Sequence, residues 1–191
     1  MTKKSKQVLV DAVVVIHAHE NRYWLPLCNA YQIALPATVI ENEVFYFDSS
    51  KGKIGLKPSN WIKQGIVTRI DAAIADYDIL AEKLSNDFML GIDAGEKEAL
   101  AILISKKYKD YFFTTADKAA AKALGVLGIG CRGISVEELL KNLGNLTKKT
   151  HLPMQYNKTW LQKCIAEGLS EQNLWLKPRN GSSRWQSDAR S

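Results

Sequence analysis

The chain has 191 residues, of which 26 are Lys or Arg and 20 are Asp or Glu, for a net charge of +6. A chain of this length can bury enough surface to fold alone, which excludes the small proteins that depend on disulfides or a structural metal. Cys28, Cys131 and Cys164 form no CxxC pair, no signal peptide is evident and no apolar run could span a bilayer. We therefore expect a reduced, cytoplasmic protein with no membrane contact.

The stretch that organises the chain is residues 8–16, VLVDAVVVI, which is apolar at almost every position and rich in β-branched side chains. Such a run predicts a strand buried on both faces of a parallel sheet. Its one carboxylate is Asp11. Burying a lone carboxylate is costly, so we expect Asp11 to emerge at the carboxyl end of the strand or to face a cation or hydrogen-bond donors there. Ligands of open α/β sheets bind at that edge.

The remaining sequence alternates between helical and strand patterns. In chain order we expect a strand at 8–16, a helix at 17–32, a strand at 33–36, a helix at 38–47, a loop or small hairpin at 48–60, a strand at 65–70, helices at 71–86 and 95–107, a strand at 111–115, a helix at 117–124, a strand at 126–130 and a short helix at 135–142. This alternation predicts an α/β fold, a three-layer α/β/α domain around a mainly parallel sheet.

Local signals support several of these boundaries. Thr38 with Glu41 predicts a capping box at the start of the 38–47 helix, and the SVEE sequence at 135–138 predicts another. Gly125 is expected to end the alanine-rich helix that precedes it.

Residues 145–191 fall outside this pattern, so we expect a domain at 1–144 followed by a basic extension. A helix is expected at about 158–168 and a disordered tail after it. Residues 1–140 hold 17 basic and 17 acidic residues, whereas 141–191 hold 9 basic and 3 acidic residues. The extension therefore supplies the whole net charge, either to contact a polyanion or to stay solvated.

Carboxylates from distant parts of the chain are expected to meet at one edge of the sheet. The carboxyl end of a parallel strand and the amino end of the next helix share an edge, so Asp11, Glu96 and Asp117 are candidate neighbours, and Glu43 could join them from its helix. Like charges at about 4 Å repel by about 4 kcal/mol at an effective dielectric near 20. Protons or a dication must relieve that repulsion, and oxygen ligands favour Mg²⁺ or Mn²⁺.

Each of these acids also has an ordinary structural explanation. Glu96 and Asp117 stand where helix-capping carboxylates are common, and Glu43 has the place of a solvated helix residue. Asp11 is the hardest to explain in this way because carboxylates are depleted in strand interiors. A dication held by the group could orient and deprotonate a water and stabilise a phosphodiester during hydrolysis.

Four short stretches carry a family resemblance. They are Asp11 after the apolar strand, Glu43-Val44 in the helix after the second strand, Gly95-Glu96-Lys97-Glu98-Ala99 at a helix start, and Thr115-Ala116-Asp117 before an alanine-rich helix. In this order, over about residues 8–143, they resemble the PIN domain, the metal-dependent nuclease fold of many prokaryotic toxin ribonucleases.

The resemblance implies a function and a set of roles. Asp11, Glu43, Glu96 and Asp117 would bind Mg²⁺ or Mn²⁺, Asp93 could replace or assist Glu96, and Thr115 would support Asp117. The substrate would be RNA. The chain would be the toxin of a toxin–antitoxin pair, with an antitoxin protein as partner. The aromatic residues at 45–47 are typical of a core, although an exposed subset could form a homodimer or antitoxin surface.

One departure from the family pattern keeps other functions open. The family often has Asn or Ser two residues after the first Asp, whereas this chain has Val13, which cannot hydrogen-bond the acids. A catalytically weak or inactive PIN-like module that binds RNA or a protein is one alternative. A DNA-directed PIN-like nuclease is another.

Overall fold

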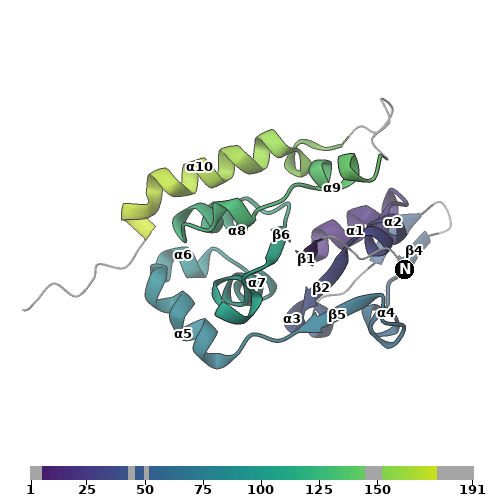
Figure 1. Ribbon diagram of the computed structural model, residues 1–191, viewed down its shortest axis with the longest axis horizontal. Coiled ribbons are helices and arrows are strands. Elements are labelled where there is room, and N and C mark those ends of the chain that lie inside the picture. The colour runs from purple at the N-terminus through teal and green to yellow at the C-terminus, as the bar shows by residue number, and fades with distance from the viewer. Residues whose placement is uncertain (1–5, 43–45, 50–51, 145–151, 176–191) are drawn as a thin grey trace, which may run out of the picture.

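The computed structural model describes residues 6–42, 46–49, 52–144 and 152–175. Its centre is a four-stranded sheet in the order β5–β2–β1–β6, and every neighbouring pair is parallel (Figure 1). These strands are β1 (Gln7–Val10), β2 (Gln32–Pro36), β5 (Val67–Ile70) and β6 (Tyr111–Thr114). A separate antiparallel pair is formed by β3 (Tyr46–Ser49) and β4 (Gly52–Gly55).

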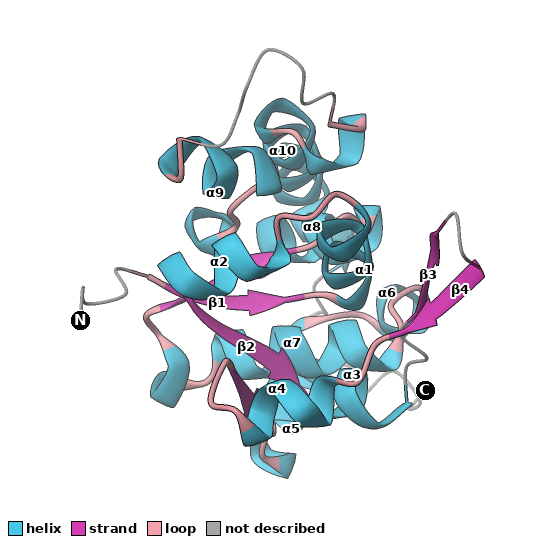
Figure 2. Ribbon diagram, turned by 90° about the vertical axis from the view of Figure 1, so that its right-hand side faces the viewer, coloured by secondary structure: helices cyan, strands magenta, loops and turns pink. Residues whose placement is uncertain are grey.

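Helices connect the strands and cover the sheet on both sides (Figure 2). They are α1 (Ala12–Glu20), α2 (Trp24–Ala30), α3 (Ala37–Asn42), α4 (Pro58–Lys63), α5 (Ile74–Lys83), α6 (Asn86–Leu90), α7 (Ala94–Ile104), α8 (Lys118–Val126), α9 (Val136–Asn142) and α10 (Lys158–Trp175), with 3₁₀ turns at η1 (Lys106–Tyr108), η2 (Gly130–Arg132) and η3 (Met154–Tyr156). None of the described helices combines the length and apolar character that crossing a bilayer requires.

Side chains alternate along the central strands and divide the interior into two main cores. Val8 and Val10 of β1 pack in one core with α1, α2 and α9, whereas Leu9 packs in the other with α5, α7 and α8. This is the period of two that a strand imposes. The predicted three-layer α/β/α architecture with a parallel sheet is confirmed, and the helix predicted at 135–142 begins with Ser135 as its cap.

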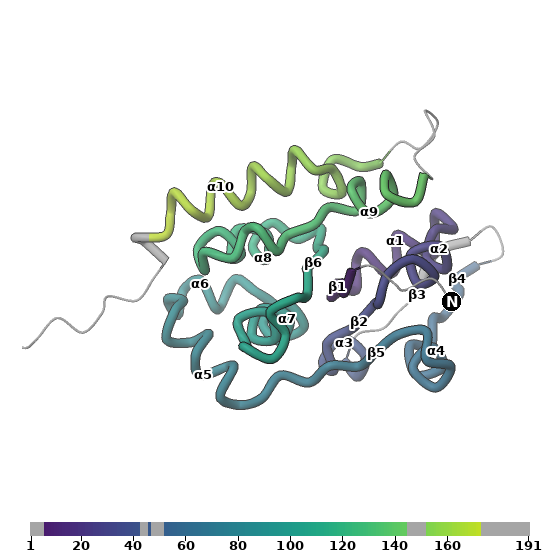
Figure 3. The backbone as a smooth tube through the Cα atoms, viewed as in Figure 1, coloured from purple at the N-terminus to yellow at the C-terminus, as the bar shows by residue number. Residues whose placement is uncertain are grey.

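The C-terminal helix α10 packs lengthwise on α8 (Figures 1 and 3). Their backbones come so close that a Cβ added to Gly125 would lie 2.1 Å from the Ile165 carbonyl oxygen, and one added to Gly168 would lie 2.0 Å from the Lys122 carbonyl oxygen. Glycine is needed wherever two backbones approach this closely. The helix is longer than the predicted 158–168, and the tail predicted beyond it lies outside the described residues.

The strand predicted for residues 8–16 is wrong beyond Val10. Asp11 has extended dihedral angles and α1 begins directly after it, so the three consecutive valines are helical. Val14 and Val15 are fully buried against the sheet, whereas Val13 is 48% exposed. Tertiary burial of one helix face therefore overrides the weak helix propensity of β-branched residues.

Three predicted helices also differ from the structure, and the one expected at 71–86 is the shorter α5, with α6 separate from it. The helix expected at 17–32 is broken at Arg22, whose φ of 60° is left-handed, and α2 begins two residues later. The helix expected at 38–47 begins at Ala37 and ends at Asn42, and residues 46 and 47 belong to strand β3. It lacks the predicted capping box: Thr38 donates its N–H to Glu98, and Glu41 pairs with Arg69.

The strand predicted at 126–130 is absent. Helix α8 continues through Gly125 to Val126 and is followed by a turn and by η2. Gly125 therefore does not end the helix; its missing side chain makes room for α10.

Candidate functional site

The four acids that the structure gathers come from helix starts around two neighbouring strands. Strands β1 and β6 pair with Val10 opposite Thr114, so Asp11 and Thr115 leave the sheet side by side. Asp11 precedes α1, and Asp117 is the cap of α8. Asp93 and Glu96 belong to the first turn of α7, which packs against β6 and α8.

Thr115 connects two of these acids. Its hydroxyl donates a hydrogen bond to Asp11 Oδ2 at 3.0 Å and its oxygen accepts one from the Asp117 backbone N–H at 3.0 Å. The hydroxyl therefore holds the Asp11 carboxylate in one orientation while it fixes the backbone that presents Asp117. Val13 does not donate to Asp11, and Thr115 supplies the polar support instead.

Three of the acids also act as helix caps. Asp93 Oδ1 accepts from the Glu96 N–H at 2.8 Å, and Glu96 Oε2 accepts from the Asp93 N–H at 3.2 Å, which makes a reciprocal capping box. Asp117 Oδ1 accepts from two backbone N–H groups of α8. Among the described residues, the second oxygen of each of these three carboxylates makes no hydrogen bond.

The acids share one electrostatic environment. Burial, with the charges of Asp93 and Asp117 added, raises the pKa of Asp11 from 3.8 to about 6, although the Thr115 hydrogen bond lowers it. Burial and the charges of Asp117, Asp11 and Asp93 raise the pKa of Glu96 from 4.5 to about 8. These side chains are 6% and 5% exposed. Within the described part of the chain, no Lys or Arg forms an ion pair with any of the four acids.

The carboxylates do not form a complete metal site as they stand. Among the described residues, no group of three or more His, Cys, Asp and Glu side chains is placed so that it could hold a metal ion. Coordination by three of these carboxylates would therefore require side chains to move from their present positions. Glu43, the remaining predicted ligand, lies outside the described residues.

A fifth acid, Glu98, has a structural role that the sequence analysis missed. It is 4% exposed, and its carboxylate accepts from the Thr38 N–H at 2.6 Å and from the Ala72 N–H at 3.2 Å. It therefore joins α7 to α3 and to the loop before α5. The available signal was its place beside the apolar run 99–104, where a carboxylate needs partners.

The C-terminal segment also contributes near the acids. Tyr156 of η3 is buried and its ring stacks on His17, 3.9 Å between centroids; His17 Nδ1 is also hydrogen-bonded to the Tyr23 hydroxyl. Burial and the charges of Glu20 and Asp11 raise the pKa of Tyr156 to about 12. No sequence motif pointed to this residue, because it lies outside the α/β pattern.

Comparison of the chain with protein families, with curated proteins and with solved structures finds no match in any of the three.

Proposed function

We propose that the chain is a metal-dependent endoribonuclease that hydrolyses RNA phosphodiesters. One observation carries the proposal: Asp11, Asp93, Glu96 and Asp117 share one electrostatic site that holds no Lys or Arg partner among the described residues. Buried carboxylates normally have such partners. Perturbed pKa values of clustered carboxylates favour a functional site over a purely structural one.

The donor set fits a hard dication. All of the candidate ligands are carboxylate oxygens, and three of the acids each keep one oxygen without a hydrogen bond among the described residues. Asp11, Asp93, Glu96 and Asp117 would hold Mg²⁺ or Mn²⁺, with Glu43 as a further candidate ligand. When bound, the ion would lower the pKa of a water and stabilise charge on the phosphodiester.

The residues of the chain have distinct roles in this proposal. Glu96, whose pKa is about 8, holds a proton near neutral pH and must release it before it can act as a ligand. Thr115 keeps Asp11 oriented. The caps made by Asp93 and Asp117 tie the ligands to the starts of α7 and α8, so their positions are set by two helices.

The substrate class and the cellular role rest on the resemblance to PIN-domain toxin ribonucleases. That resemblance favours RNA as the substrate and a toxin role controlled by an antitoxin protein.

The direct test is cleavage of single-stranded RNA in the presence of Mg²⁺ or Mn²⁺. Asp11→Asn should lower the rate by at least about tenfold, and chelator should abolish cleavage. Glu41→Gln is the matched control because that carboxylate pairs with Arg69 at 2.5 Å, outside the acidic site, and cleavage should persist. Equal rates for Asp11→Asn and the unaltered chain, or cleavage in chelator, would exclude the proposal. Branched DNA as a competing substrate tests the DNA-directed alternative.

One observation favours a second candidate, a binding module without catalysis. No described group of three or more ligand-type side chains is ready to hold a metal, and such a module needs none. The discriminating measurement is the melting temperature during titration with Mn²⁺. A ligand at 100 times its dissociation constant stabilises the folded state by about 2.7 kcal/mol. A clear rise that Asp11→Asn removes supports the nuclease, and a flat titration supports the binding module.

A further inference from the structure

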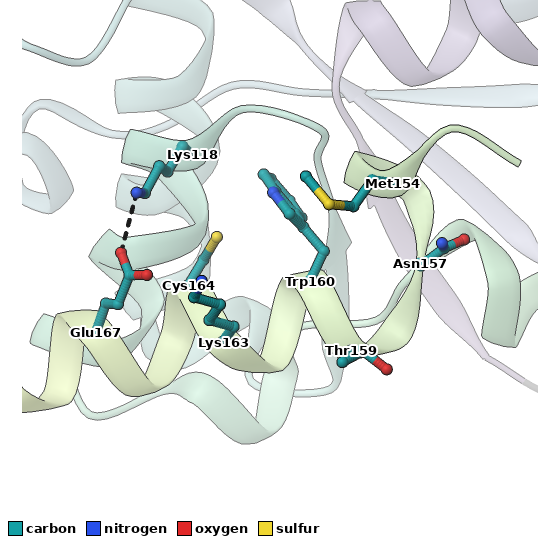
Figure 4. Close-up of a pocket in the computed structure, with 8 residues that line it drawn as sticks. All are labelled: Lys118, Met154, Asn157, Thr159, Trp160, Lys163, Cys164 and Glu167. Carbon is teal, nitrogen blue, oxygen red and sulfur yellow. Dashed lines mark ion pairs between the residues drawn. The ribbon is translucent and has the colours of Figure 1, made fainter.

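A cavity of about 380 Å³ lies between α10, η3 and the start of α8. Its volume falls within the roughly 300–1,000 Å³ range of small-ligand pockets. Figure 4 shows Trp160 and Cys164 projecting from α10, with the Met154 thioether beside the indole ring. The lining residues are Lys118, Met154, Asn157, Thr159, Trp160, Lys163, Cys164 and Glu167.

Lys118 links this cavity to the acidic site. A second cavity, of about 490 Å³, is lined by Asp117 and by Lys118, Lys122 and residues of α6. Lys118 lines both cavities. A bound strand could therefore pass from the acids at the start of α8 over Lys118 and into the cavity beside Trp160.

The lining combines an aromatic ring, a thioether and neutral polar side chains, which a nucleotide base could contact. Trp160 offers a flat ring face. One part of this side chain packs against the small core that α8 and α10 share, so the residue is partly buried. Met154, which is 69% exposed, supplies a polarisable neighbour. Asn157 and Thr159 supply hydrogen-bonding groups. Stacking on aromatic side chains, together with basic groups along the backbone, is the usual means of holding a single strand.

The charges also suit a phosphate backbone. Lys118 Nζ lies 3.1 Å from Glu167 Oε2 (Figure 4), so its charge is already paired, although the residue lines both cavities. Lys163 has no ion-pair partner among the residues that the structure describes, and its side chain is exposed. A phosphate can therefore reach Lys163 without breaking an existing ion pair.

We infer that this cavity is a nucleotide subsite for the RNA strand, in which one base stacks on Trp160 and a flanking phosphate contacts Lys163. The inference rests on the proposed function and gives the extension a role in it: α10 and η3 would bind the strand next to the acids. A hydrophobic peptide is the competing occupant. Glu167 neutralises Lys118 in the lining, but Lys163 and the two neutral polar side chains favour a nucleotide.

Binding should be measured apart from cleavage. The full-length chain is titrated in chelator against a short fluorescein-labelled oligouridylate, and fluorescence anisotropy gives the dissociation constant. Trp160→Ala should weaken binding by roughly 5- to 150-fold, the effect of losing one base–aromatic stack. Trp160→Phe keeps a ring and should recover most of the affinity. Because Trp160 also packs against the protein, Met154→Asp is a second variant: it places a negative charge at an exposed position in the same cavity and should weaken binding.

Lysine variants distinguish the subsite from general charge attraction. Lys163→Gln should weaken binding and reduce the slope of log affinity against log salt by about 0.7, the value for one phosphate contact on a single strand. Lys109→Gln, which removes an exposed charge between η1 and β6, is the matched control and should change neither. A 5-bromouridine version of the oligonucleotide should crosslink to Trp160 on irradiation.

The outcomes separate this inference from the proposed function. Unchanged affinity in Trp160→Ala and Met154→Asp, or equal losses in Lys163→Gln and Lys109→Gln, overturns the subsite even if the chain cleaves RNA. Tighter binding of an apolar peptide than of the oligonucleotide also overturns it. If the Trp160 and Lys163 variants lose affinity while the unaltered chain does not cleave RNA, the subsite is supported and the proposed nuclease function is excluded.

Discussion

At the scale of single residues, the acids of this chain divide into those with backbone partners on both oxygens and those without. Glu98 has each of its oxygens occupied by a backbone N–H, whereas Glu96, two residues earlier, uses only one. The two side chains are similarly buried. Burial alone therefore does not distinguish a structural acid from a candidate ligand. The number of carboxylate oxygens that accept a backbone hydrogen bond does.

The pH dependence of stability should reveal the acidic site. Because the pKa values of Asp11 and Glu96 are raised to about 6 and about 8, the folded chain holds these protons more tightly than the unfolded chain. Their contribution to the free energy of unfolding is fully present below pH 3.8 and is lost as the pH rises through about 6 and then about 8. In chelator, the melting temperature should fall over that window.

Two additions sharpen this measurement. Glu96→Gln cannot ionise, so the variant should be more stable than the unaltered chain at pH 8 in chelator, by an amount on the order of a few kcal/mol. Saturating Mn²⁺ should abolish the fall in melting temperature with rising pH in the unaltered chain. It should not restore metal binding to the Glu96→Gln variant. Equal pH profiles for the two chains would contradict the raised pKa of Glu96.

Replacing Glu98 should lower the stability of the fold, whereas Glu96→Gln should raise it at pH 8. Glu98→Ala leaves the N–H groups of Thr38 and Ala72 without their acceptor, and each buried unpaired donor costs about 1–3 kcal/mol. The variant should unfold at lower urea concentration at every pH. Lys97→Ala, on the same turn of α7, is the control and should change stability by less than about 0.5 kcal/mol. An unchanged midpoint in Glu98→Ala would argue against the observed bonds.

At the scale of elements, the crossing of α8 and α10 depends on two glycines. Gly168→Ala would place a methyl group 2.0 Å from the Lys122 carbonyl oxygen, so the helices must separate. Overpacking of this kind costs about 1–3 kcal/mol or more. Urea denaturation should show the loss. Gly91→Ala is the control because its nearest contact would be an ordinary 3.5 Å; a similar loss there would mean that the crossing is not the cause.

The sequence predicted elements best where local and tertiary preferences agree. Strand β2 and the Ser135 cap of α9 were found close to their observed positions. Prediction failed where packing decides: the valines after Asp11 are helical because α1 buries one face against the sheet, and Gly125 is internal to α8 because α10 lies on it. Neither fact is visible within a window of neighbouring residues.

The candidate site was predicted in part, for a related reason. Placing Asp11, Glu96 and Asp117 near one another needed only the rule that parallel strands share an edge, together with a family resemblance. The hydrogen bonds of Thr115 and the capping box of Asp93 follow from local chain geometry. Tyr156 approaches Asp11 only through the fold of the C-terminal segment, which no local pattern indicates.

At the scale of the whole molecule, the segment after residue 151 completes the interior. Leu152 and Tyr156 belong to the core around α1 and α2, while Leu161 and Cys164 pack with Ala121 of α8. The described part of the extension is therefore built into the body of the protein.

A chain that ends at Gly144 should show this dependence. Removal of η3 and α10 exposes the apolar face of α8 and leaves the His17 ring without Tyr156. We expect a lower melting temperature and stronger binding of a dye that reports exposed apolar surface. Full retention of the melting temperature would show that the 1–144 domain is independent of the extension.

The glycine crossing also has a consequence for tracing the ancestry of the chain. Any distant descendant of the same ancestor that keeps α10 in this place must keep glycine at the positions of Gly125 and Gly168, whatever happens to the rest of the surface. A pair of glycines at this separation, one in an alanine-rich helix and one in a later amphipathic helix, is a criterion by which such descendants could be recognised when overall identity has faded.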